Sequence, residues 1–155
     1  WIDMGCDASK ITVLHSGIDI SKFEYRARHA NPEQQINIIS IARLVEMKGI
    51  PYSIQAVAQL IKEGRDITYT IIGDGEMRSE LEQLITALGV GEQITILGWK
   101  KHEEVQRLLD DAHILVAPSV TATRGETEGI PNAVKEAMAM GLPVVSTHCM
   151  AAMLN

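Results

Sequence analysis

Two kinds of segment alternate along this 155-residue chain, and their alternation limits the folds that it can adopt. The first kind is a short run rich in β-branched and apolar residues, as expected of a strand buried on both faces of a parallel sheet. We expect six such strands, at Ile11–His15, Ile36–Ala42, Ile67–Gly73, Gln93–Gly98, Ile114–Ala117 and Leu142–Ser146.

The second kind of segment has apolar residues at intervals of three and four, which give a helix one apolar stripe. Three such stripes lie at Ile54–Ile61, Met77–Leu88 and Val105–Ala112, and a fourth helix is expected over Pro131–Met140. Strands that alternate with helices predict an α/β domain with a Rossmann-like, doubly wound parallel sheet. Ligands of such sheets bind at the carboxyl ends of the strands.

Composition excludes several classes of function. Fourteen basic and 20 acidic residues give a formal charge of −6, so we expect no nucleic acid as a partner, although a local basic pocket is compatible with this charge. No apolar run reaches the ~20 residues of a membrane-spanning helix, and the start at Trp1 does not resemble a signal peptide. Cys6 and Cys149 are far apart, which favours a cytoplasmic protein. The scattered histidines predict no metal site.

Both ends of the chain look cut. We expect residues 1–25 to be the remnant of an interdomain segment and residues 26–155 to form an incomplete main domain, which begins with a polar, linker-like stretch over Arg26–Gln35. No element has room to finish after Thr147, so the domain is expected to be truncated at its C-terminal end. Such an edge favours self-association through exposed apolar side chains, here Val144, Val145, Met150 and Met153.

Two cations follow the first strand of the expected main sheet. Arg43 and Lys48 are five positions apart on one loop, so both can converge on one anion. Arginine offers a planar fork and lysine a compact charge, and together they suit a diphosphate. Two solvated surface charges would give the same pattern.

A second loop leads into the helix expected at Pro131, whose first amides would favour a phosphate at the same edge. Glu128 precedes this helix and Glu136 lies in its second turn, so they do not form the facing acid pair of a glycosidase. Near a phosphate, carboxylates suit sugar or ribose hydroxyls. The alternative makes Glu128 a loop acid favoured by the helix dipole and Glu136 an exposed helix residue.

A third loop contains two glycines after a strand, Gly73 and Gly75, as a dinucleotide-binding turn would. The third glycine of that motif is replaced by Arg78, so a tight turn between strand and helix explains the pair better than a dehydrogenase site. The turn Gly98-Trp99-Lys100 ends another strand at this edge and can offer groups to a nucleotide base. A purely structural turn is an equal alternative.

Taken together, these loops resemble the donor-binding half of the retaining glycosyltransferases of group 1, which have the GT-B fold. The resemblance covers residues 1–147, and the segments 98–100 and 118–122 are similar to a subgroup that makes exopolysaccharides of the colanic-acid type. The main matches are His-Ser-Gly-Ile-Asp at 15–19, Ala-Arg-Leu-Val-Glu-Met-Lys-Gly at 42–49, Ile-Ile-Gly-Asp-Gly at 71–75, and an E-x7-E motif within 128–147.

The resemblance implies a role for each candidate residue in binding a nucleotide-sugar or a nucleoside diphosphate. Arg43 and Lys48 would hold the diphosphate and, with Glu128, form the catalytic set. Donor-sugar hydroxyls and phosphate would meet Glu128 and the backbone of Gly129, Ile130, Pro131 and Asn132. Glu136 would bind the ribose, and Gly98, Trp99 and Lys100 the base. No metal or cofactor is implied, because the cations and the helix end would stabilise the departing diphosphate.

Two departures from the family qualify this implication. Cys149-Met150-Ala151-Ala152 stands where the family has a glycine-rich turn and another glutamate. The N-terminal acceptor domain, which supplies the family's catalytic histidine, is absent from this sequence, so we expect the chain alone not to transfer sugar. The parent enzyme is expected in the cytoplasm, at the inner face of the membrane. A non-catalytic nucleotide-sugar-binding module is the main alternative.

Overall fold

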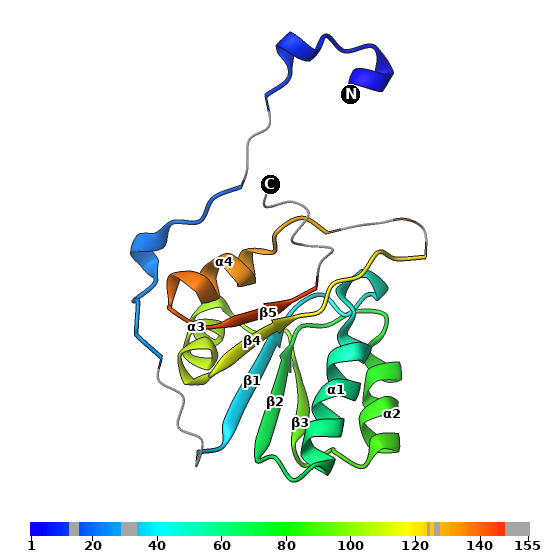
Figure 1. Cartoon of the computed structure of the whole chain (residues 1–155), viewed down its shortest axis with the longest axis vertical. Coiled ribbons are helices and arrows are strands. Elements are labelled where there is room, and N and C mark those ends of the chain that lie inside the picture. The colour runs from blue at the N-terminus through cyan, green and yellow to red at the C-terminus, as the bar shows by residue number, and fades with distance from the viewer. Residues whose placement is uncertain (13–15, 29–33, 124, 126–127, 148–155) are drawn as a thin grey trace.

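The computed structural model describes residues 1–12, 16–28, 34–123, 125 and 128–147, and within them the expected alternation of strands and helices is found (Figure 1). The strands are β1 (Ile36–Ile41), β2 (Ile67–Ile72), β3 (Ile94–Gly98), β4 (Ile114–Ala117) and β5 (Val144–Ser146). The α-helices are α1 (Ile50–Lys62), α2 (Arg78–Leu88), α3 (His102–Asp111) and α4 (Asn132–Ala139).

The strands form one parallel sheet in the order β3-β2-β1-β4-β5. The chain moves outward from β1 to β3, then returns to place β4 on the other side of β1. Between β1 and β4 the strand order therefore reverses, and such a switch point opens a crevice at the carboxyl ends of the two strands. The predicted doubly wound sheet is confirmed.

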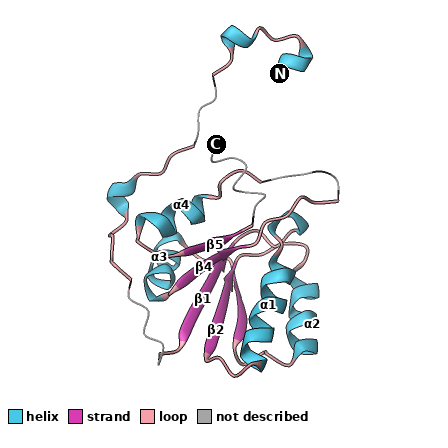
Figure 2. Ribbon diagram, viewed as in Figure 1, coloured by secondary structure: helices cyan, strands magenta, loops and turns pink. Residues whose placement is uncertain are grey.

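Helices cover both faces of the sheet, with α1 and α2 on one face and α3 and α4 on the other (Figure 2). Each face has its own apolar core. Leu44, Ile54 and Leu81 are fully buried in the first, and Leu109 and Ala137 in the second. The apolar stripes of the helices supply most of these residues, because each helix turns its stripe toward the strands.

The sequence placed five strands within two residues of their observed bounds. The expected strand Ile11–His15 is different: residues 11 and 12 belong to no strand, and residues 13–15 lie outside the described residues. The fourth helix begins at Asn132 rather than Pro131. Pro131 is the N-cap, with an extended backbone (ψ 144°), so its ring precedes the helix instead of opening it.

One buried hydroxyl network joins the sheet to α1. The Tyr69 side chain on β2 is fully buried, and its hydroxyl lies 2.7 Å from the hydroxyls of both Ser40 on β1 and Ser53 on α1. The two serines also donate to the carbonyls of Val116 and Ile50, respectively. Burial raises the pKa of Tyr69, so the phenol stays neutral and donates its one proton to either serine oxygen, and every hydroxyl of the network has at least one partner.

Tyr69→Phe is therefore expected to lower the free energy of unfolding by about 1–3 kcal/mol, because it removes the phenol hydroxyl that hydrogen-bonds to the serines inside the core. Urea unfolding of the variant measures this loss. Tyr52→Phe is the matched control, since the Tyr52 ring is 61% exposed and its change should cost little. Equal stability losses in the two variants would contradict a role for the buried network.

The segment before β1 lies against the second face of the domain. The backbone N–H of Arg26 donates to the Met140 carbonyl at 3.3 Å, and the guanidinium groups of Arg26 and Arg28 bind the Asp110 carboxylate of α3 at 2.6 and 3.3 Å. This part of the expected linker is thus attached to the domain. The residues from 1 to 12 lie away from the sheet (Figure 1). The boundary expected at residue 25 stays a prediction.

Candidate functional site

The loops that follow β1 and β4 meet at the switch point of the sheet. After β1, residues Glu46–Lys48 form a short 3-10 helix, and the left-handed Gly49 (φ 62°) ends it. The Val120 N–H donates to the Met47 carbonyl at 2.9 Å, which joins the two loops. A Cβ on Gly49 would lie 2.0 Å from the Pro118 carbonyl oxygen, so only glycine permits this approach.

Lys48 and Glu128 form an ion pair across this crevice, and their side chains are only 16% and 13% exposed. The other carboxylate oxygen of Glu128 accepts a hydrogen bond of 2.6 Å from the hydroxyl of Ser119. Two separate elements, the loop after β1 and the end of β4, therefore hold this carboxylate. Each oxygen keeps a further lone pair with which to accept a ligand hydroxyl.

Arg43 adds a second positive charge beside the pair. Its side chain is exposed, and it has no carboxylate partner among the described residues. Burial lowers the pKa of Lys48, and the charge of Arg43 lowers it further. Both effects disfavour the charged ammonium, and an anion bound between the two cations would offset them by favouring the charged form. The two cations outnumber the single carboxylate, so this part of the site favours an anion.

A pocket of about 600 Å³ connects these groups. Of the eleven candidate site residues, seven line it: Arg43, Lys48, Trp99, Lys100, Glu128, Pro131 and Asn132. The predicted convergence of three loops at one sheet edge is thus present in the structure. Their roles toward a ligand stay predictions.

The other four candidates are not among the described residues that line the pocket. Gly98 is buried, and its carbonyl accepts a hydrogen bond of 2.9 Å from the Gly73 N–H. Ile130 packs against the core beneath α3 and α4, and Gly129 is exposed. Glu136 is half-buried in the second turn of α4. A role for any of these four stays a prediction.

The start of α4 opens on the same pocket. Its N-cap, Pro131, offers no side-chain cap to the first amides of the helix. Proline has no N–H, so Pro131 cannot be one of the phosphate donors that were expected between Gly129 and Asn132. Asn132 and Ala133 line the pocket at the positive end of the helix dipole, and their amides are the suitable donors. The sequence pointed to Asn132 but not to Ala133.

Trp99 and Lys100 also line the pocket. The Trp99 side chain is 74% exposed, which leaves its ring free to stack on a planar ligand. Lys100 lies 3.6 Å from Glu104 in an exposed pair that fixes it weakly. An exposed aromatic ring beside a cation suits a nucleotide base, and the base-binding role stays a prediction.

The glycine turn after β2 has a structural explanation. A Cβ on Gly73 would lie 1.8 Å from the Ala42 carbonyl oxygen, and one on Gly75 would lie 2.4 Å from that of Leu44. Between the two turns, the Leu44 N–H donates to the Asp74 carbonyl at 2.9 Å. Both glycines therefore allow the loops after β1 and β2 to lie side by side, so their role is structural, although the sequence pointed to a tight turn between strand and helix and not to this contact between loops.

Other side chains with chemical potential have structural partners. His113 accepts a hydrogen bond of 3.0 Å from the Asn37 N–H, and His102 lies edge-on to Phe23. Among the described residues, no group of three or more His, Cys, Asp and Glu side chains could hold a metal ion. No helix in the described ranges is both long and apolar enough to span a bilayer. Cys149, Met150 and Met153 lie outside the described residues.

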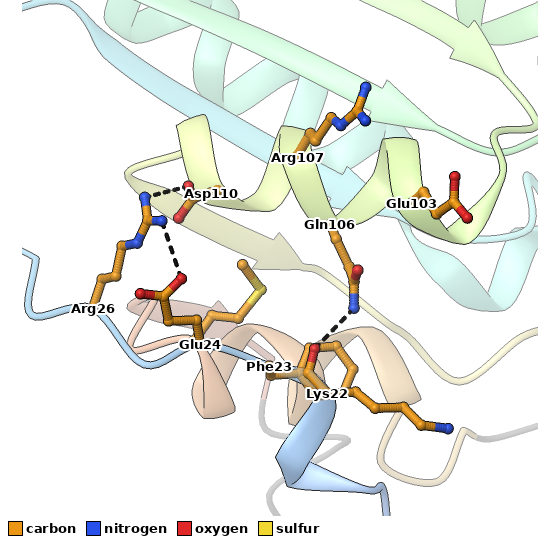
Figure 3. A pocket seen from close by; sticks show the side chains of 9 residues that line it. Lys22, Phe23, Glu24, Arg26, Glu103, Gln106, Arg107 and Asp110 are labelled. Atoms are coloured by element: carbon orange, nitrogen blue, oxygen red, sulfur yellow. Dashed lines mark hydrogen bonds and ion pairs between the residues drawn. The ribbon is translucent and has the colours of Figure 1, made fainter.

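A second hollow, of about 370 Å³, lies between α3 and the segment before β1 (Figure 3). Arg26 reaches both Glu24 and Asp110 there, at 3.2 and 2.6 Å, while Gln106 donates to the Lys22 carbonyl at 3.3 Å. Its lining balances three cations, Lys22, Arg26 and Arg107, with three carboxylates, Glu24, Glu103 and Asp110. This hollow therefore has no excess of positive charge, whereas in the crevice two cations, Arg43 and Lys48, face the Glu128 carboxylate.

Comparison with known proteins identifies the family. A family model described as "Glycosyl transferases group 1" matches residues 21–153. The chain belongs to the group 1 glycosyltransferases. This glycosyltransferase chain is 44% identical, over 95% of its length, to the amylovoran biosynthesis glycosyltransferase AmsK of Erwinia amylovora. It is 42% identical, over 93% of its length, to the putative colanic acid biosynthesis glycosyltransferase WcaL of Escherichia coli. It spans 36% and 35% of these relatives, about a third of their length.

Solved structures assign the fold within this family. HepE of Anabaena, in complex with UDP and glucose, superposes with a TM-score of 0.77 at 25% identity, over 99% of this chain and 42% of that one. The C-terminal domain of the group 1 glycosyltransferase LpcC of Francisella tularensis gives a TM-score of 0.67 at 26% identity, over 86% and 71% of the two chains. The group 1 chain thus has the fold of the C-terminal half of a GT-B enzyme.

Proposed function

We propose that this chain is the donor-binding domain of a glycosyltransferase that moves a sugar from a nucleotide-sugar to a saccharide or lipid-linked acceptor in polysaccharide biosynthesis. One observation carries the proposal: Arg43, Lys48 and Glu128 share a pocket with the uncapped start of α4 at the switch point of the sheet. The HepE structures with UDP and with UDP-glucose are similar to this chain over 99% of its length and support a ligand of that class.

Each part of the pocket suits one part of a nucleotide-sugar. Arg43, Lys48 and the first amides of α4 are placed for the diphosphate, because cations and a helix N-terminus both stabilise phosphate oxygens. Trp99 and Lys100 offer a wall for the base. Glu128 is the acceptor for hydroxyls of the donor sugar. Glu136 is proposed for the ribose, which requires its side chain to reach the pocket when the ligand is bound.

The proposed reaction is sugar transfer with retention of the anomeric configuration. Charge develops on the departing diphosphate, and preorganised cations lower the barrier most where charge develops. Arg43 and Lys48 would supply this stabilisation, and the reaction as proposed uses no metal or cofactor. Acceptor binding and the exclusion of water would fall to an N-terminal domain of the parent enzyme. The proposed location is the cytoplasm, with the parent enzyme at the inner face of the membrane.

The first experiment is a panel of nucleoside diphosphates and nucleotide-sugars, including UDP and UDP-glucose, screened for thermal stabilisation. A ligand at about 100 times its Kd should stabilise the chain by about 2.7 kcal/mol. Stabilisation by a diphosphate and by its nucleotide-sugar is the expected result. A chain that no member of the panel stabilises would refute the proposal.

Two substitutions test the assignments within the nucleotide. Arg43→Ala should weaken the diphosphate about tenfold to a hundredfold, through loss of a charge-assisted hydrogen bond, and should change the affinity for the plain nucleoside little. Glu136→Ala should weaken both ligands. Arg65→Ala is the matched control, because Arg65 is an exposed arginine outside the pocket. Calorimetric titration gives the affinities, and an Arg43→Ala variant indistinguishable from Arg65→Ala would exclude the diphosphate role.

A further inference from the structure

Ser119 is a buried polar residue to which the proposed function gives no role. It follows β4 by two residues and is only 3% exposed. Its hydroxyl donates to Glu128 at 2.6 Å, and its carbonyl accepts a hydrogen bond from the Thr147 hydroxyl just after β5. Ser119 therefore connects the ends of two neighbouring strands to the carboxylate of the pocket.

The Ser119 hydroxyl provides a connection between Glu128 and the sheet that the backbone does not. Glu128 lies in the loop before α4 and belongs to no helix or strand. Without secondary structure, the direction of its carboxylate depends on what its two oxygens contact. One oxygen faces the Lys48 ammonium, and the other accepts from Ser119. Two contacts on opposite oxygens fix the plane of a carboxylate, whereas one would let it rotate.

The hydrogen bond has the geometry of a strong one. A hydroxyl that donates to a carboxylate typically does so at about 2.5–2.7 Å, and the observed 2.6 Å lies in that range. The hydroxyl is also buried, and a buried hydroxyl is costly unless it is paired. Ser119 is thus committed to Glu128. Among the described contacts of this carboxylate, Lys48 is the other partner, and it is the one that the phosphate of a ligand would attract.

We infer that Ser119 is a positioning residue for the donor sugar: it holds the Glu128 carboxylate toward the pocket when a diphosphate recruits Lys48. The inference rests on the proposed function and extends it to a residue that does not itself touch the donor. When Lys48 turns to the phosphate, Glu128 loses one of its two anchors. The bond from Ser119 then keeps its free oxygen directed at the sugar hydroxyls.

The test compares UDP with UDP-glucose by calorimetric titration. Ser119→Ala should weaken UDP-glucose about threefold to tenfold, the effect of one lost hydrogen bond, and leave UDP unchanged. Ser119→Cys, which fills the same space with a weaker donor, should give a smaller loss in the same direction and guards against an alanine variant that fails to fold. In a Glu128→Ala background, Ser119→Ala should have no further effect on UDP-glucose, because its only route to the sugar is gone.

Ser53→Ala is the matched control. Ser53 is equally buried, at 4% exposed, but its hydroxyl bonds within the core to Ile50 and Tyr69. Its loss should lower stability without changing the ratio of the two affinities. A Ser119 effect that falls equally on UDP and UDP-glucose, or persists in the Glu128→Ala background, overturns the inference and leaves Ser119 a structural residue. If the wild-type chain binds no member of the panel, the proposed function is overturned instead. That result comes from the wild-type protein alone, so it is distinct from a failure of the inference about Ser119.

Discussion

Gly49→Ala is expected to lower the free energy of unfolding by about 4 kcal/mol, a large share of the roughly 5–15 kcal/mol that stabilises a typical domain. Two costs combine at this position. The left-handed backbone (φ 62°) is strained for any residue with a Cβ. That Cβ would also lie 2.0 Å from the Pro118 carbonyl oxygen. This oxygen belongs to the backbone, so it cannot move aside as a flexible side chain could.

Gly89→Ala separates the two costs. Gly89 has nearly the same backbone conformation (φ 72°) at the end of α2, but nothing lies within 4 Å of its missing Cβ. Its substitution should therefore cost only the backbone strain, about 1–2 kcal/mol. Urea unfolding of both variants measures the difference. If Gly49→Ala costs no more than Gly89→Ala, the close contact between the loops after β1 and β4 is not required for stability.

Strands were the easiest part of this fold to predict, because β1 to β5 are short apolar runs between turn residues. The first and last residues of a strand were harder to predict where the same residues could also end a neighbouring helix. The predicted strand began at Leu142, but the Leu142 N–H donates to the Ala137 carbonyl at 2.9 Å and closes α4. Pro143 follows and has no N–H to give a neighbouring strand, so β5 starts at Val144.

The general position of the site was also predictable. Arg43, Lys48 and Glu128 follow strands, and the carboxyl ends of parallel strands meet at one edge whatever the loops between them do. Seven of the eleven candidates line the pocket for this reason. The start of α4 was placed within one residue by Pro131 alone.

Contacts between loops were not predictable, because the spacing of apolar residues, which reveals helices and strands, carries no information about them. Ser119 donates to Glu128 from nine positions away, and the Thr123 N–H donates to Glu46 at 3.1 Å across 77 positions. Each depends on where two irregular segments lie relative to each other. Ser119 did carry one signal, a small polar residue just after a strand at the ligand-binding edge, but that signal is common to many serines.

Lys48→Ala is expected to weaken UDP about a hundredfold, at the upper end of the range for a lost charge-assisted hydrogen bond. The reason is the position of Glu128. In the ligand-free protein Lys48 neutralises this carboxylate, and both side chains are largely buried. Without the ammonium, the pocket keeps a negative charge that faces the phosphates and loses a positive one.

Glu128→Ala should act in the opposite way on UDP. Its loss frees Lys48 from a competing anion, so the affinity for UDP should be unchanged or higher, while UDP-glucose should lose its sugar contact. The double variant should then bind UDP better than Lys48→Ala alone, because the uncompensated carboxylate is removed. A double-mutant cycle from calorimetric titrations measures this coupling.

Lys62→Ala is the control for net charge, since Lys62 is an exposed lysine at the end of α1 and does not line the pocket. It should leave both affinities unchanged, because exposed charges beyond the Debye length of about 10 Å are screened. Two results would remove the assignment of Lys48 to the diphosphate. One is a UDP affinity in Lys48→Ala no lower than in Lys62→Ala. The other is a double variant as weak as Lys48→Ala, since Glu128 would then have no influence on the phosphate position.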